Sequence, residues 1–168
     1  MGKLHIRPAT SEDVAALAEL KCTYVRNLYR GFISQSILNR STPPFHANTL
    51  NAWLANDDFR IALAERDGVI IQFVVYGNNP DAPYNGLLYE GVCDHLVTTT
   101  EEKRAMVNYC LDDLRAMGHS KAYLWILVDN FRVRYLFESL GFRPDGAREV
   151  REMFGQELRI ARYVYPLS

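Results

Sequence analysis

The sequence predicts an α+β fold, with a mixed, mostly antiparallel central sheet and helices on both of its faces. Three strand-like runs follow one another in the middle of the chain, amphipathic helical stretches lie before and after them, and a nearly all-apolar strand lies between two later helices. The chain has 168 residues, the usual length of one domain. We therefore expect residues 1–168 to form a single domain.

The first sixty residues predict one strand followed by helices. The expected elements are a strand at 4–7, a helix from Thr10 or Ser11 to about Tyr29, one or two helical turns within 32–39, and a short helix at 48–54. Alternation marks the strand, whereas an apolar stripe with the period of a helix marks the long helix. Gly31 can end that helix, and the two prolines at 43–44 separate the later helical stretches.

The middle of the chain predicts an antiparallel meander. The expected elements are strands at 59–65 and 69–76, a loop at 77–83, and a third, long strand at 87–97. Arg66-Asp67-Gly68 joins the first two strands and is a typical short hairpin turn.

The last third predicts alternating helices and strands. The expected elements are a helix that opens at 98–100 and closes at Gly118, a strand at 121–128, a helix from Asp129-Asn130 to Leu140, and a strand at 159–165. The strand at 121–128 is almost wholly apolar, as expected where both sheet faces are covered. The mixed charges of residues 148–159 are typical of an exposed hairpin, although a weaker interpretation makes this segment an interaction surface.

The composition excludes several classes of protein. Hydrophobic residues make up 48% and charged residues 23%, and 19 basic against 20 acidic residues give a net charge of −1. A nucleic-acid-binding protein normally carries a basic excess, so we expect no nucleic-acid partner. No apolar run suffices for a signal peptide or a membrane span, which predicts a cytoplasmic protein without a membrane partner. Scattered cysteines and histidines indicate no metal site.

Four segments carry a family resemblance. They are residues 6–13, 61–71 and 124–130, together with Phe-Glu-Ser-Leu-Gly-Phe-Arg-Pro-Asp-Gly at 137–146. This pattern resembles the GNAT superfamily of acetyl-CoA-dependent N-acetyltransferases. The resemblance implies transfer of an acetyl group from acetyl-CoA to a primary amine of a small-molecule or peptide acceptor, and by analogy it suggests a homodimer. The acceptor stays open between a protein N-terminus, a lysine, a polyamine, an amino sugar and a drug.

The expected pyrophosphate-binding loop departs from the family pattern. That pattern is Arg/Gln-x-x-Gly-x-Gly/Ala, in which glycines let the backbone approach the phosphate, and here the positions read Glu102-Lys103-Arg104-Ala105-Met106-Val107. Thr98 with Glu101, and Thr99 with Glu102, each fit a capping box that would satisfy the free amides of the helix. Two glutamates would also repel a pyrophosphate, and Lys103 and Arg104 would offset part of that repulsion.

The resemblance also names candidates for proton transfer. The Tyr that often acts as general acid is replaced by Phe137, which has no proton to give, and Tyr135 lies on another side of the helix. A carboxylate on the long central strand often acts as base, so Glu90 is the first candidate and Asp94, on the same strand face, the second. Either carboxylate can equally be a solvated edge residue or an arginine partner.

Further cofactor contacts follow from the same resemblance. Asn130 matches a residue that often contacts the cofactor, although it is equally suited to be a helix N-cap. The backbone of Leu96 and Val97 would hold the pantetheine arm like an added strand. Lys103, Arg104 and Ala105 complete the predicted cofactor site. Four aromatic residues of the early helices would line an acceptor pocket or pack in the core: Tyr24, Tyr29, Phe45 and Trp53.

Two hypotheses on function follow. The first is a GNAT-type N-acetyltransferase that uses acetyl-CoA as co-substrate. The second is a degenerate, non-catalytic protein of the same fold that binds another ligand or a protein partner, and the altered loop and Phe137 favour it. The sequence shows neither an acidic nor a basic acceptor pocket.

Overall fold

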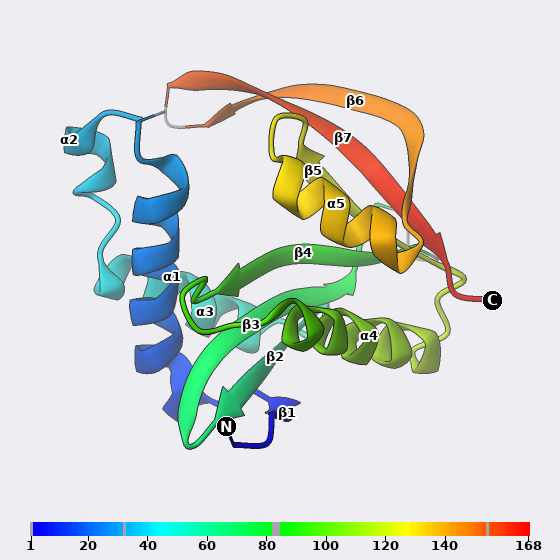
Figure 1. Ribbon diagram of the computed structural model, residues 1–168, viewed down its shortest axis with the longest axis horizontal. Coiled ribbons are helices and arrows are strands. Elements are labelled where there is room, and N and C mark those ends of the chain that lie inside the picture. Colours follow the sequence, from blue (N-terminus) through cyan, green and yellow to red (C-terminus); the bar gives the residue numbers. More distant parts are fainter. Residues whose placement is uncertain (1, 32, 82–84, 154) are drawn as a thin grey trace.

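The computed structural model describes residues 2–31, 33–81, 85–153 and 155–168 (Figure 1). Its elements are β1 (His5–Pro8), η1 (Ser11–Asp13), α1 (Val14–Tyr29), α2 (Gln35–Leu38), α3 (Pro43–Leu54), β2 (Phe59–Arg66), β3 (Val69–Asn78), β4 (Asn85–Cys93), α4 (Thr100–Ala116), β5 (Lys121–Leu127), α5 (Phe131–Leu140), β6 (Arg143–Met153) and β7 (Gln156–Pro166). The described strands form a sheet in the order β1-β2-β3-β4-β5-β7-β6, antiparallel except between β4 and β5. The predicted α+β class is confirmed.

Two apolar layers hold the helices to the sheet. On one face, Leu17 of α1 and Leu50 of α3 pack against Leu63 and Phe73 of the sheet, and all four are fully buried. On the other face, the buried side of α4, with Met106 among its residues, packs against the alternate residues of β2 to β5, and α5 lies at its margin. Helices therefore cover both faces, as the strand alternation predicts (Figure 1).

Local sequence signals correctly predict several element ends. The turn between β2 and β3 places Asp67 at φ 55° and Gly68 at φ 78°, the left-handed pair of a type I′ hairpin. Gly141 ends α5 at φ 107°, a conformation that favours glycine. The helical turns expected within 32–39 appear as α2, although residue 32 lies outside the described residues.

Several expected bounds are wrong. Helix α3 begins at Pro43 rather than at 48, because Thr42 caps it and prolines in the first turn need no amide partner. Strand β3 continues to Asn78, into the expected loop at 77–83, of which residues 82 and 83 lie outside the described part. Strand β4 begins at Asn85 and ends at Cys93 instead of Val97.

Strand β6 was not among the expected strands. It is an edge strand that pairs only with β7, and its charged residues lie exposed, so no apolar alternation marks it. The hairpin expected at 148–159 is the outer part of this β6–β7 pair.

Candidate active site

A gap in the sheet creates the candidate site. Strands β4 and β5 pair only where Asn85–Leu87 face Lys121–Tyr123. Beyond that point β4 still pairs with β3, and β5 still pairs with β7, but β4 and β5 no longer pair with each other. The pairing of β3 with β4 also contains a bulge at Tyr89: Val75 pairs with Glu90 and Tyr76 with Leu88, so Tyr89 has no partner in β3. A bulge of this kind bends its strand.

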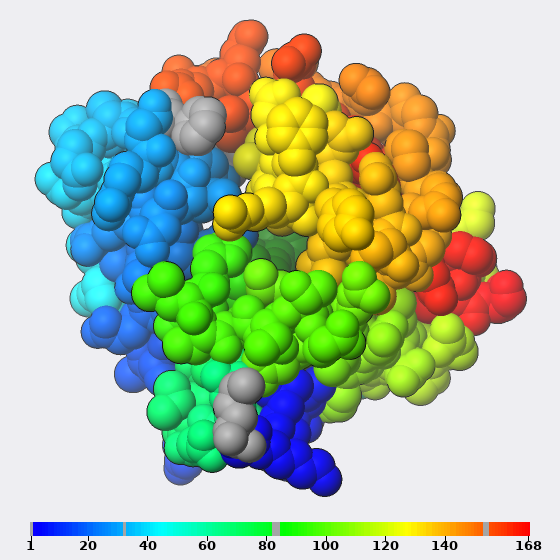
Figure 2. All heavy atoms as spheres, viewed as in Figure 1, coloured from blue at the N-terminus to red at the C-terminus, as the bar shows by residue number. Residues whose placement is uncertain are grey.

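A cavity of about 1640 Å³ lies along this gap. Residues of α1, α3, β4, β5, α4 and α5 line it. Figure 2 shows a hollow between the green surface of the β4–α4 region and the yellow surface of α5.

The cavity is basic, which the sequence did not predict. Glu90 is the single acidic residue among the described residues that line it. Six basic residues also line it: Lys21, Arg40, Lys103, Arg104, Arg132 and Arg151. These six residues come from five separate parts of the chain, so no local cluster of basic residues in the sequence predicts a basic cavity.

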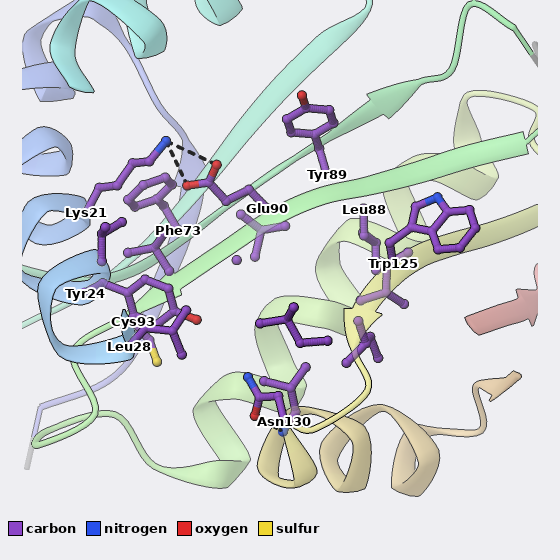
Figure 3. Close-up of a pocket in the computed structure, with 18 of the residues that line it drawn as sticks. Lys21, Tyr24, Leu28, Phe73, Leu88, Tyr89, Glu90, Cys93, Trp125 and Asn130 are labelled. Carbon is purple, nitrogen blue, oxygen red and sulfur yellow. Dashed lines mark hydrogen bonds and ion pairs between the residues drawn. The ribbon is translucent and has the colours of Figure 1, made fainter. Parts of the chain in front are cut away.

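Glu90 lies inside the cavity and is paired with Lys21 (Figure 3). The Lys21 Nζ atom lies 3.0 Å from Glu90 Oε1 and 3.2 Å from Oε2, and it also lies 4.8 Å from the centroid of the Trp53 ring. The Lys21 side chain is only 11% exposed. The sequence holds one signal that could have identified Lys21 as a site residue. This lysine lies within the apolar stripe of α1, beside Leu17, Ala18 and Cys22.

Asp94 is not brought together with Glu90. It follows the end of β4, and its Oδ1 accepts a hydrogen bond from the Leu96 amide at 3.0 Å, which closes a turn. Asp94 is not among the described residues that line the cavity. The expected shared strand face of the two carboxylates is therefore wrong, because the strand ends before Asp94.

Leu96 and Val97 lie in the same turn, outside the strand on which they were expected. Leu96 is 95% exposed, and the carbonyl of Val97 accepts a hydrogen bond from Arg66 Nη2 at 3.0 Å. Neither residue is among those that line the cavity. The unpaired backbone edge along the cavity belongs instead to the second half of β4.

The start of α4 is capped by its own side chains. Thr99 accepts a hydrogen bond from the Glu102 amide at 3.1 Å, and Glu102 accepts one from the Thr99 amide at 2.9 Å, which confirms one predicted capping box. The other box is wrong, because Thr98 donates its hydroxyl to the Ile71 carbonyl.

Arg66 neutralises the glutamate of this cap. Its Nη1 lies 2.5 and 2.6 Å from the two Glu102 oxygens, in a pair whose side chains are 11% and 13% exposed. Burial acts to raise the pKa of Glu102, but the hydrogen bonds from Arg66 and Thr99 outweigh it and lower that pKa. The negative charge of Glu102, one of the two glutamates expected to repel a phosphate, is thus compensated within the protein.

Basic side chains surround the starts of α4 and α5. Lys103, Arg104 and Arg132 line the cavity there, and the buried Nε of Arg104 has no hydrogen-bond partner among the described residues. Burial, together with the charges of Lys103 and Arg132, lowers the pKa of His95, which also lines the cavity. Ala105 is not among the lining residues.

Asn130 has one of the two roles expected of it, that of helix N-cap, and its contact with a cofactor stays a prediction. Its Oδ1 accepts a hydrogen bond from the Val133 amide at 3.3 Å, so it is the N-cap of α5. It also lines the cavity (Figure 3).

The remaining predicted residues are aromatic. Phe137 packs edge-on against Phe142, with ring centroids 5.1 Å apart, and Tyr135 is 71% exposed. All four aromatic residues expected at the acceptor pocket line the cavity: Tyr24, Tyr29, Phe45 and Trp53. The pKa values of the Tyr24 and Tyr29 hydroxyls are raised, mainly by burial.

Sequence reasoning missed a buried histidine in this wall. His46 of α3 is 4% exposed, its Nε2 lies 2.6 Å from Ser41 Oγ, and its Nδ1 has no partner among the described residues. Burial, with smaller effects of the Lys21 and Arg26 charges, lowers the pKa of His46 to about 4. It is therefore a neutral ring at pH 7.

Neither metal nor membrane features stand out. The described residues contain no group of three His, Cys, Asp or Glu side chains that could hold a metal ion. None of the described helices has the length and apolar character needed to cross a bilayer.

Comparisons with known proteins identify the fold. No family model and no curated protein matches the sequence. Among solved structures, the YncA protein of Salmonella typhimurium with acetyl-CoA matches with a TM-score of 0.75, at 19% identity over 98% of this chain and 94% of that one.

Two further solved structures agree. The ribosomal-protein-alanine N-acetyltransferase of Brucella melitensis matches with a TM-score of 0.76, at 20% identity over 96% and 99% of the two chains. A GNAT-family acetyltransferase of Streptococcus pneumoniae matches with a TM-score of 0.74, at 17% identity over 99% and 100%. At these identities the likeness establishes the fold.

Proposed function

We propose that this chain, which has the fold of the GNAT-family acetyltransferases, transfers an acetyl group from acetyl-CoA to a primary amine. The observation that carries the proposal is the cavity between β4 and β5, which has basic side chains at the starts of α4 and α5 and the carboxylate of Glu90 on β4. An anionic cofactor suits the first region and an amine the second. The YncA protein, which has the same fold, was solved with acetyl-CoA.

The residues near α4 and α5 fit the phosphates of this co-substrate. Lys103, Arg104 and Asn130 keep the roles expected from the sequence, and Arg132 joins them. The buried, unpartnered Nε of Arg104 supports this assignment, because an orphaned cationic donor is costly without an acceptor. Arg66 removes most of the repulsion expected from Glu102.

The second half of β4 fits the pantetheine arm. Its backbone groups on the side of β5 have no strand partner past Leu87, and amide groups of an extended arm can pair with such an edge. We assign this role to residues 88–93 in place of Leu96 and Val97. No particular side chain is needed for it.

Glu90 is our proposed proton acceptor. When acetyl-CoA is bound, its thioester would supply the acetyl group: the amine nitrogen forms a C–N bond to the acetyl carbon, and the C–S bond breaks. An acceptor that arrives as an ammonium loses two protons, the first to Glu90 before attack and the second, as the amide forms, to the departing thiolate, which leaves as the thiol of CoA. Each Glu90 oxygen keeps a lone pair beyond its contact with Lys21. Phe137 supplies no proton, but a thiolate is a tolerable leaving group, since thiol pKa values lie near about 8.5.

A non-catalytic GNAT-fold protein is the competing proposal. The Thr99–Glu102 cap, which occupies the helix start, and the phenylalanine at 137 favour it. The two proposals differ on whether CoA is released from acetyl-CoA.

Calorimetric titration with acetyl-CoA tests the cofactor site. We expect wild-type binding, and about tenfold weaker binding for Arg104→Gln, because a charge-assisted hydrogen bond is lost. Arg148→Gln, an exposed arginine of β6 outside the cavity lining, is the matched control and should bind as wild type. Equal affinities of the two variants would contradict the assignment of Arg104, and no binding at millimolar acetyl-CoA would contradict the function.

Rates of CoA release with an acceptor test Glu90. Glu90→Gln should lower kcat by roughly 10²-fold or more, the usual contribution of a positioned base, and leave acetyl-CoA affinity within about twofold. Because this change leaves Lys21 buried without its carboxylate, the double variant Lys21→Met with Glu90→Gln controls for stability. A wild-type rate in either variant would exclude Glu90 as the base.

A further inference from the structure

The part of the cavity around Glu90 combines aromatic residues with one largely buried ion pair. Tyr24 lines it close to the Lys21–Glu90 pair (Figure 3). Trp53 and the half-exposed Tyr89 also line the cavity and pack edge-on, with ring centroids 5.4 Å apart. Lys21 Nζ lies over the Trp53 ring. An acceptor that fills this space needs an apolar, preferably aromatic, body.

The charges here disfavour a polycation. Lys21 and Glu90 cancel each other, and Arg40 and Arg151 also line the cavity. Arg40 has no ion pair among the described residues, and Arg151 pairs with Glu149, which is outside the lining. The remaining charge is positive, so a polyamine would meet like charges and only one carboxylate.

The Lys21–Glu90 pair offers a cation and a carboxylate side by side on the cavity lining, 3.0 Å apart. The ammonium and carboxylate of an α-amino acid are also neighbours, so both can meet an opposite charge here. A bound amino acid can place its nitrogen at Glu90 and its carboxylate at Lys21, so that four charges alternate. An amine without a carboxylate would instead have to share Glu90 with Lys21 and add an uncompensated positive charge.

We propose that the acceptor is an aromatic α-amino acid, bound with its nitrogen at Glu90 and its carboxylate at Lys21. This inference rests on the proposed function, which it deepens by naming the substrate class. Glu90 then both orients the nitrogen and receives its proton. Arg40 adds a longer-range attraction for the carboxylate and repels competing polycations.

Binding of three amines tests the substrate class without requiring turnover. L-Phenylalanine, phenethylamine and spermidine are titrated calorimetrically, with and without saturating CoA. Phenethylamine has the same ring and nitrogen as phenylalanine but lacks the carboxylate. We expect phenylalanine to bind at least about tenfold more tightly than phenethylamine, and spermidine to bind most weakly.

Two variants locate the carboxylate contact. Lys21→Met should lower phenylalanine affinity at least about tenfold while phenethylamine affinity stays the same or rises, because Glu90 becomes free for its ammonium. Arg40→Gln changes an exposed residue and is the alternative test if the Lys21→Met variant does not fold. It should lower the affinity for phenylalanine a few-fold and leave the affinity for phenethylamine unchanged. Arg30→Gln, an exposed arginine at the end of α1 and outside the lining, is its matched control.

The outcomes separate this inference from the proposed function. Equal or tighter binding of phenethylamine or spermidine, no binding of phenylalanine, or equal losses for both aromatic amines in Lys21→Met would overturn the substrate class. If phenylalanine binds selectively but mass spectrometry finds no N-acetylphenylalanine with acetyl-CoA, the substrate class stands as a ligand class and the transferase function fails. Acetylation of another amine in preference to phenylalanine keeps the transferase and overturns the amino acid.

Discussion

At the scale of single residues, surroundings decide what a side chain can do. Glu90 and Asp94 are both carboxylates of one strand-like run, yet Glu90 pairs with Lys21 on the cavity lining and Asp94 closes a backbone turn. Their difference comes from the end of β4 at Cys93, which takes Asp94 off the strand. Which of the two carboxylates can take part in a reaction therefore depends on the residue at which the strand ends.

The buried ring of His46 makes stability depend on pH. Its pKa is lowered to about 4 in the folded protein, while an unfolded histidine titrates near about 6.5. Between these values the unfolded chain binds a proton that the folded one does not, so stability is lost as pH falls from about 6.5 to about 4, by up to about 1.4 kcal/mol per pH unit from this group. Asp13, whose pKa Arg7 lowers to about 2, acts only at lower pH.

Urea unfolding between pH 7 and pH 4 measures this effect. His46→Gln should flatten the dependence in that window, while His5→Gln, a change at an exposed histidine of β1, should keep the wild-type slope. Identical slopes in wild type and His46→Gln would show that His46 does not stay neutral when folded.

At the scale of elements, the start of α4 shows how an unfavourable local sequence is compensated. Its glutamate cap uses amides that a phosphate would otherwise use, and its charge opposes an anion. Arg66, 36 residues earlier at the end of β2, cancels that charge and also binds the Val97 carbonyl. With Glu102 neutralised, the two cations Lys103 and Arg104 outweigh the one remaining negative charge of the first turn, that of the exposed Glu101.

Removal of Arg66 should weaken acetyl-CoA binding although Arg66 is not among the described lining residues. Arg66→Gln leaves Glu102 with an uncompensated charge beside the phosphate region, and we expect an affinity loss of about three- to tenfold. The double variant Arg66→Gln with Glu102→Gln should recover most of the loss, measured by calorimetry. Failure of the second change to recover affinity would show that Arg66 acts by supporting the turn and not by charge.

At the scale of the whole molecule, the divergence of β4 and β5 splits the sheet into two halves. One half is β1 to β4 with α1 and α3, and the other is β5, β7 and β6 with α5 at its side (Figure 1). Only three paired residues on each strand join the halves across the sheet. A ligand in the cavity would contact both halves and bridge them.

Acetyl-CoA should therefore stabilise the folded protein as a unit. At about 100 times its dissociation constant, a ligand that binds only the folded state adds about 2.7 kcal/mol, which raises Tm by roughly 5 to 10 °C for a chain of this size. Thermal unfolding by circular dichroism with and without acetyl-CoA measures it, and Arg104→Gln should show a smaller shift at the same concentration. An unchanged Tm at saturating acetyl-CoA would contradict binding between the halves.

The sequence by itself determined most elements of the fold and some of its ends. The β2–β3 hairpin, the cap of α4 at Thr99 and the end of α5 at Gly141 all follow from neighbours a few residues apart. Interactions between such near neighbours can be predicted from one sequence. The extent of β4 and the existence of β6 could not be predicted, because a strand end and an edge strand depend on the strands they pair with.

Only the tertiary structure decided the character of the site. Lys21 and Glu90 are separated by 69 residues, and the chain as a whole has a net charge of −1. Yet the fold gathers six basic residues and one carboxylate on the lining of one cavity. The physical reason is that sequence patterns record interactions between near neighbours, whereas the field in a cavity is the sum of charges that packing brings together from distant segments.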